Sequence, residues 1–134
     1  MVSLITGRKG SGKTKRLIEQ VNKAVEASSG NVVCVEKERL LTYDINYRAR
    51  LIETDFYKVS GYKAFYGFLS GICAGDHDIT DILIDATLRI GGRDYDALGN
   101  MLEKVAVLTK DVNVTFTVSA DVDELPAKVK AFIK

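Results

Sequence analysis

One short segment near the N-terminus matches the pattern G-x-x-x-x-G-K-[ST] without a mismatch: Gly7-Arg8-Lys9-Gly10-Ser11-Gly12-Lys13-Thr14. Glycines let the backbone curl until several N–H groups converge on one point, and a helix that begins there adds its partial positive charge. In this pattern Lys13 is expected to reach the β- and γ-phosphates of a nucleotide, and the Thr14 hydroxyl to hold Mg²⁺. The spacing therefore predicts that all eight residues form a phosphate-binding loop.

The segments on either side of this loop favour the same interpretation. Val2 to Thr6 is a short apolar run typical of a buried strand. Lys13 to about Ala27 is predicted to be a helix, because apolar residues recur on one face of it: Leu17, Ile18, Val21, Ala24 and Val25. A strand before the loop and a helix after it are the setting in which this motif, the P-loop or Walker A motif, is found. A chance glycine-rich turn would need neither element.

A carboxylate later in the chain is the predicted second ligand of the metal ion. Asp85 follows the hydrophobic run Ile82-Leu83-Ile84 in the manner of a Walker B motif, and it is expected to hold Mg²⁺ through water, opposite Thr14. The simpler alternative is an aspartate that caps a turn at the end of a strand. Because the next residue is Ala86, the common Asp-Glu pair is absent. A hydrolase would have to orient its attacking water with a group from elsewhere.

The elements that must position these residues alternate along the chain. Strands are predicted at Val2–Thr6, Asn31–Val35, Arg50–Glu53, Ile79–Ala86 and Val112–Ser119. Helices are predicted from Lys13, from Gly61 to about Ala74, after a capping Asp94, and after a capping Asp123 with Pro126 in the first turn. This alternation predicts an α/β fold, a three-layer α/β/α sandwich around a mostly parallel five-stranded sheet. Ligands of such sheets bind at the carboxyl ends of the strands, where the candidate residues fall.

The segment V-C-V-E-K-E-R-L-L, Val33 to Leu41, together with this order of elements, resembles the ATPase core of the RecA-like family of P-loop NTPases. The resemblance implies an essential glutamate shortly after the strand that follows the P-loop helix. Glu38 is the better placed and Glu36 the second, while a solvated loop charge is the alternative for Glu38. The resemblance also implies that Val112–Ser119 lies between the P-loop strand and the Asp85 strand. Ser119 would then be a sensor of the γ-phosphate, or else a strand-end hydroxyl satisfied by a turn.

Other polar and aromatic residues give weaker indications. Arg89 and Arg93 flank two glycines in a predicted loop, where they could clamp a phosphate or simply be solvated. Arg8 and Lys9 are expected to face solvent or a partner. Aromatic residues are interleaved with basic residues from Tyr43 to Phe68, and such a segment could stack bases. A core with one interface is the commoner outcome, so nucleic acid is not an expected partner.

Composition limits the classes of function. The 134 residues, 46% of them hydrophobic, predict a single nucleotide-binding domain over residues 1–134. The net charge of +1 gives no general attraction to nucleic acid or membranes. Cys34 and Cys73 lack metal-site spacing and are expected to be buried thiols in a reducing compartment. No apolar run is long enough for a membrane span, and the early motif leaves no room for a signal peptide, so a cytoplasmic protein is expected.

The sequence thus predicts a Mg²⁺-dependent ATP-binding protein, an ATPase with a minimal RecA-like core. The absence of an N-K-x-D guanine motif favours ATP over GTP. Two alternatives stay open. One is a nucleoside-type small-molecule kinase, whose lids would be the Arg39–Ser60 and Arg89–Asp94 segments. The other is a non-catalytic, nucleotide-dependent switch. Minimal cores of this family often need assembly for full activity, which implies a homo-oligomer or a protein partner.

Overall fold

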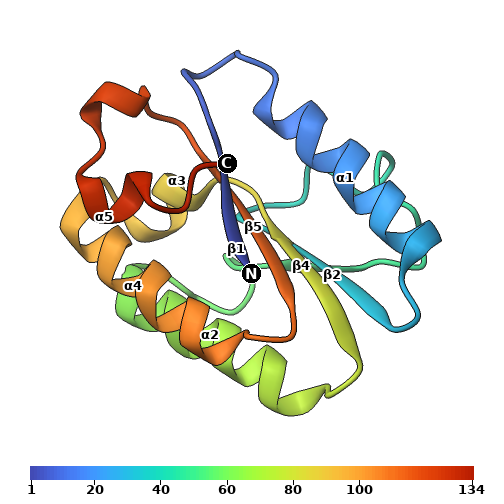
Figure 1. The fold of residues 1–134 in the computed structure, drawn as a ribbon. Helices are drawn as coiled ribbons and strands as arrows, with labels where there is room; N and C mark the ends of the chain where they lie inside the picture. The colour runs from blue at the N-terminus through green and yellow to red at the C-terminus, as the bar shows by residue number, and fades with distance from the viewer.

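A five-stranded, fully parallel sheet forms the middle layer of the computed structural model, which describes residues 1–134 (Figure 1). The strands are β1 (Val2–Thr6), β2 (Asn31–Glu36), β3 (Arg50–Glu53), β4 (Ile79–Ile84) and β5 (Asn113–Val118). Their order across the sheet is β1-β5-β4-β2-β3. The last strand therefore lies between the strand before the glycine-rich loop and the strand before Asp85, as predicted. All five carboxyl ends meet at one edge of the sheet, because every pair is parallel.

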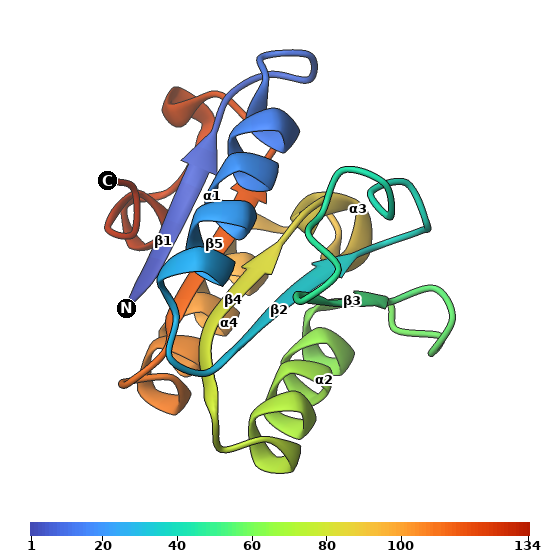
Figure 2. The same ribbon diagram turned by 90° about the vertical axis from the view of Figure 1, so that its right-hand side faces the viewer.

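Helices cover both faces of the sheet, which confirms the predicted α/β fold and fits three layers. One face carries α1 (Lys13–Ala27), and the other carries α2 (Tyr62–Gly75), α4 (Tyr95–Leu108) and the short α5 (Ala127–Lys130), as Figures 1 and 2 show. Two small elements complete the chain, the short helix α3 (Thr87–Gly91) and a 3₁₀ turn at Val122–Glu124. The helix bounds of α1 and the Asp94 cap of α4 agree with the sequence prediction, and the Asp94 side chain accepts a hydrogen bond from Ala97 N–H at 3.0 Å.

Two hydrophobic cores hold the sheet between these layers. The core under α2 and α4 is the larger, and the rings of Phe65 and Phe116 meet edge to face in it, 6.2 Å apart. The core under α1 also contains Leu41 and Ile45 from the connection between β2 and β3. Burial of these two side chains anchors that connection to the core under α1, because exposing them would cost about 1.5–3 kcal/mol each. The turn that carries Glu38 is therefore attached to the core through the residues that follow it in the sequence.

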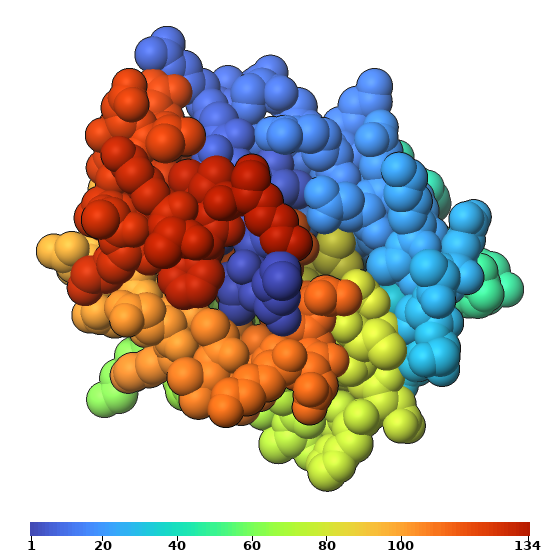
Figure 3. Space-filling view, in the orientation of Figure 1, coloured from blue at the N-terminus to red at the C-terminus, as the bar shows by residue number.

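The C-terminal segment lies beside the start of the chain. The Leu4 N–H donates to the Phe132 carbonyl at 3.1 Å, and Leu4 and Ile133 form a parallel bridge. Figure 3 shows the last residues packed around the first ones on the surface. The outer edge of β1 is therefore covered at its centre by the chain itself, which leaves β3 as the uncovered edge strand.

Three predicted details were wrong. The Arg89–Arg93 segment was predicted to be a loop, but it is helical up to Gly91. Gly91 is there to let the helix pack closely against Tyr62, because a Cβ at this position would lie 2.1 Å from the Tyr62 ring. Asp123 does not cap the last helix but lies inside the 3₁₀ turn, since the residue before Pro126 is held extended and separates the two elements. The strand β4 ends at Ile84, two residues early, because Ala86 adopts a left-handed backbone conformation.

Candidate phosphate-binding site

The Gly7–Thr14 loop joins β1 to α1 at the carboxyl edge of the sheet. Gly10 and Gly12 have φ values of 84° and 88°, a region that L-residues adopt only with strain. Gly12 immediately precedes α1, so its conformation turns the chain into the helix. Gly7 also has a positive φ, 148°, and in addition a Cβ there would lie 2.5 Å from Ser11 Oγ. The glycines of the motif therefore stand where the backbone conformation requires them.

Lys13 folds back over this loop. Its Nζ donates to the Arg8 carbonyl at 2.8 Å and to Ser11 Oγ at 3.4 Å, and the residue is only 6% exposed. Burial lowers the pKa of Lys13, and the Asp85 carboxylate opposes that shift. The ammonium thus has only neutral oxygens as hydrogen-bond partners. An anion that entered the adjoining cavity would offer it a stronger, charge-assisted bond.

Thr14 and Asp85 meet although they are far apart in the sequence. Thr14 Oγ1 lies 3.2 Å from Asp85 Oδ2 and 3.4 Å from Oδ1. Asp85 directly follows β4, and its N–H donates to the Val35 carbonyl at 2.9 Å, which fixes its backbone to β2. A hydroxyl and a carboxylate are hard oxygen donors of the kind that Mg²⁺ prefers. The structure therefore brings together the two residues predicted to hold the metal ion.

Thr117 on β5 is a site residue that the sequence did not single out. Its buried hydroxyl, 2% exposed, donates to Asp85 Oδ1 at 2.6 Å and accepts from the Ala86 N–H at 3.1 Å. One side chain thus orients the carboxylate and also holds the backbone of Ala86, whose φ is 58°. The predicted sensor, Ser119, lies two residues later and lines the same cavity. The available signal was a hydroxyl inside an apolar strand that ends at the site.

A cavity of about 1150 Å³ opens beside these groups. Its walls come from the loop, α1, the turn after β2, α3 and the segment after β5. The charged residues that line the cavity are mainly basic, six cations against three carboxylates. The cations are Arg8, Lys9, Lys13, Lys15, Arg89 and Arg93, and the carboxylates are Asp85, Asp121 and Glu124. Arg8 is paired with Asp121 at 2.8 Å, so one of the six cations already has an acidic partner. An excess of positive charge around a cavity of this size suits a polyanionic ligand.

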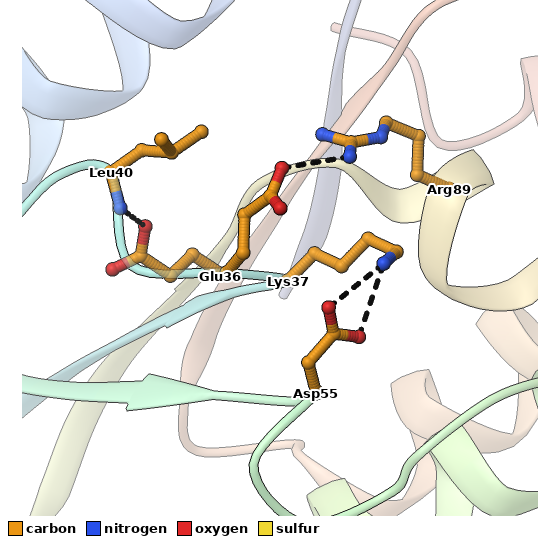
Figure 4. A network of polar contacts seen from close by, with 6 residues as sticks. Glu36, Lys37, Leu40, Asp55 and Arg89 are labelled. Atoms are coloured by element: carbon orange, nitrogen blue, oxygen red, sulfur yellow. Dashed lines mark hydrogen bonds and ion pairs between the residues drawn. The ribbon is translucent and has the colours of Figure 1, made fainter.

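The two candidate glutamates occupy different environments. Glu36 is 3% exposed, and its Oε1 accepts from the Leu40 N–H at 2.9 Å, the contact drawn in Figure 4. The same oxygen accepts from the Leu41 N–H at 3.2 Å, while the buried Oε2 has no partner. Burial raises the pKa of Glu36, and the two backbone N–H groups oppose that shift. Glu36 therefore holds the turn after β2 in shape. Glu36 and Glu38 are both absent from the cavity lining, although Leu40 and Leu41 belong to it.

Glu38 is held by an ion pair across the rim of the site. Its Oε1 accepts from an Nη atom of Arg89 at 2.8 Å. Figure 4 shows Arg89 reaching from α3 toward the turn after β2. A second ion pair on the same turn joins Lys37 Nζ to Asp55 at 2.9 Å and does not involve the cavity. The structure thus places Glu38 next to the site without directing its carboxylate into it.

No three His, Cys, Asp or Glu side chains converge anywhere in the chain. A metal ion that one carboxylate and one hydroxyl hold would complete its shell with phosphate oxygens and water, which is how Mg²⁺ is often bound.

No helix has both the length and the apolar character that a membrane span requires. Comparison with protein-family models and with curated protein sequences gave no match.

Proposed function

We propose that this chain is a Mg²⁺-dependent ATP-binding protein that hydrolyses ATP and has the RecA-like topology of P-loop NTPases. The observation that carries the proposal is the approach of Thr14 Oγ1 to the Asp85 carboxylate at 3.2 Å, beside a lysine folded over a glycine loop. These groups come from β1–α1 and β4, and they face one cationic cavity. Such a convergence is what binding of a metal-complexed triphosphate requires.

The order of the strands supports the assignment of topology. A strand lies between the loop-bearing β1 and the Asp85-bearing β4, and β2, which leads to Glu38, is the next strand beyond β4. The position of β5 between β1 and β4 is the part of this order that the RecA-like resemblance implies. The parallel bridge of Ile133 beside β1 extends the sheet on its other side.

Mg²⁺ would be held by Thr14 and Asp85, and it would neutralise charge on the phosphates that it contacts. The residues fit this ion, because both offer oxygen ligands and Thr117 already holds the carboxylate in place. Lys13 would exchange its bond to the Arg8 carbonyl for a bond to the β- and γ-phosphates. The backbone N–H groups of the loop would bind the remaining phosphate oxygens.

Glu38 is the residue that we propose to orient the attacking water. The water oxygen attacks the γ-phosphorus, the bond from that phosphorus to the bridging oxygen of ADP breaks, and Glu38 accepts the proton that the water loses. The products are ADP and inorganic phosphate. Glu36 is a poorer candidate, because its Oε1 is occupied by two backbone N–H groups and its side chain is buried.

A nucleotide-dependent switch is the second candidate function. The observation that favours it is the ion pair of Glu38 with Arg89, which keeps the proposed water-orienting carboxylate occupied. A protein that binds ATP without hydrolysing it would signal through the shape of its cavity rim. Another copy of the chain or a different protein would then respond to that shape.

Calorimetric titration with MgATP, MgGTP and MgADP tests the proposal. The variant is Lys13→Ala, and the matched control is Lys23→Ala, which replaces an exposed lysine of the same helix. We expect Lys13→Ala to weaken MgATP binding about 10- to 100-fold, since a charge-assisted hydrogen bond contributes about 1.5–3 kcal/mol. Lys23→Ala should bind like the wild type. Absence of wild-type binding, or equal binding by both variants, would refute the proposal.

A phosphate-release assay on the same samples separates the alternatives. Release with MgATP and water alone indicates the hydrolase. Binding with no release under any condition indicates the switch. Consumption of ATP only when a nucleoside or another hydroxyl acceptor is added indicates the small-molecule kinase.

A further inference from the structure

Arg89 stands between the cavity and Glu38. The arginine lines the cavity together with Lys13 and Asp85, whereas its partner Glu38 does not. The two side chains are 57% and 46% exposed, so water surrounds much of the pair. Arg89 thus pairs with the proposed water-orienting carboxylate and also lines the proposed nucleotide site.

We propose that Arg89 is a positioning residue for which Glu38 and the terminal phosphate of the bound nucleotide compete. Without a triphosphate, Arg89 holds Glu38 at the rim. When a γ-phosphate occupies the cavity, Arg89 turns to it, and Glu38 is released to orient water. This inference rests on the proposed function and adds the regulation of the same site.

The energetics permit such an exchange. A partly exposed ion pair contributes little to stability, since water and salt screen it. A terminal phosphate carries more charge than a carboxylate and presents oxygens that match the fork of a guanidinium. The phosphate is therefore the stronger partner for Arg89 whenever the cavity is filled. ADP lacks this group and leaves the pair with Glu38 intact.

The surrounding structure confines the exchange to side chains. On one side, Leu88 and Ile90 are buried on α3 directly next to Arg89, and close packing of Gly91 on Tyr62 holds the end of that helix. On the other side, the Glu36 carboxylate caps the turn that carries Glu38. Both backbones are therefore held in place, and rotation of the two exposed side chains is enough to separate the pair.

Equilibrium binding of two probes, the non-hydrolysable MgAMPPNP and MgADP, measures this competition. Glu38→Gln keeps the size of the side chain and removes the charge that competes for Arg89. We expect Glu38→Gln to bind MgAMPPNP about two- to fivefold tighter than wild type, the range that corresponds to a surface ion pair, with MgADP affinity unchanged. Arg89→Ala should weaken MgAMPPNP but not MgADP, and Arg89→Lys should recover part of the loss.

The double variant Glu38→Gln/Arg89→Ala isolates the coupling between the two residues. If Glu38 acts through Arg89, the double variant binds both probes like Arg89→Ala alone. Hydrolysis of MgATP supplies a second readout: Glu38→Gln should bind the triphosphate more tightly yet release less phosphate. A merely structural role for the pair would not move affinity and turnover in opposite directions.

Lys37→Ala is the matched control, because it breaks an ion pair of similar length on the same turn that does not contact the cavity. It should bind both probes like wild type. The inference is overturned if Glu38→Gln leaves the ratio of MgAMPPNP to MgADP affinity unchanged, or if it tightens MgAMPPNP binding equally in the Arg89→Ala background. In either case the proposed function still stands as long as nucleotide binding depends on Lys13. Absence of wild-type binding to either probe overturns the proposed function and the inference together.

Discussion

Thr117 is the residue on which the geometry of the candidate metal site most depends. Its hydroxyl donates to Asp85 at 2.6 Å and accepts from Ala86 N–H at 3.1 Å. Thr117→Val keeps the shape of the side chain and removes both hydrogen bonds. A buried hydrogen bond to a charged group contributes about 1.5–3 kcal/mol, and Asp85 and the Ala86 N–H each lose a partner. We therefore expect the free energy of unfolding to fall by about 2 kcal/mol.

Thermal unfolding and metal titration provide the assay. For a domain of this length, a loss of about 2 kcal/mol lowers Tm by roughly 5–10 °C. The Asp85 carboxylate would also be less well oriented, and outer-shell hydrogen bonds of this kind change metal affinity about tenfold or more. Mg²⁺ titration in the presence of ADP should therefore show weaker metal binding by Thr117→Val, while ADP binding without Mg²⁺ changes little.

Thr115→Val is the matched control for this experiment. Thr115 lies on the same strand, but its hydroxyl reaches only Ser3 Oγ, at 3.4 Å. Its replacement should change stability by less than about 0.5 kcal/mol, as for substitutions away from a buried network. Thr117→Ser retains the hydroxyl and should keep the Mg²⁺ affinity. The reasoning would be refuted if Thr117→Val matched Thr115→Val in both stability and Mg²⁺ affinity.

Two further predictions concern folding stability, each measurable by denaturant titration. Glu36→Gln keeps an acceptor for the turn and removes a buried charge. Burial raises the folded-state pKa of Glu36, which means that the ionised carboxylate destabilises the folded protein. The variant should therefore have a larger free energy of unfolding than wild type at neutral pH. That gain should shrink as pH falls through the pKa of Glu36, and a pH-independent difference would contradict the reasoning. Gly71→Ala should stabilise α2 by up to about 1 kcal/mol, since its Cβ meets open space. Gly91→Ala should cost about 1–3 kcal/mol, because its Cβ would strike the Tyr62 ring, and equal stabilities of the two glycine variants would count against both assignments.

Local patterns were sufficient to predict most of the fold. The strand bounds of β1 and β3 and the helix bounds of α1 follow from apolar periodicity and from glycines at the turns. The glycine conformations in the Gly7–Thr14 loop follow from the motif itself. The approach of Thr14 to Asp85 was also predictable, because the loop after β1 that leads to Thr14 and the residue after β4 lie at the same carboxyl edge of a parallel sheet.

Contacts between residues distant in the sequence were not predictable in this way. Thr117 looks like an ordinary strand threonine until β5 is known to lie beside β4, which brings its hydroxyl to Asp85. The ion pair of Glu38 with Arg89 joins residues 51 positions apart, and it forms because α3 begins directly after the Asp85–Ala86 corner. The buried role of Glu36 depends likewise on how the following turn folds back.

Under the proposed function, the site divides into a part whose geometry is fixed by internal contacts and a part that can move. Ala86 is held in a left-handed conformation that costs an L-residue about 1–2 kcal/mol, and the same Thr117 hydroxyl that holds it also orients Asp85. Such strain persists only where surrounding contacts over-determine the geometry. Glu38, in contrast, is held by a half-exposed ion pair that is inexpensive to break. Under the proposed function, binding therefore needs little rearrangement, whereas hydrolysis needs Arg89 to change partner. Under that function, the chain should bind ATP and ADP with similar ease, and it should hydrolyse ATP only after the γ-phosphate has drawn Arg89 away from Glu38.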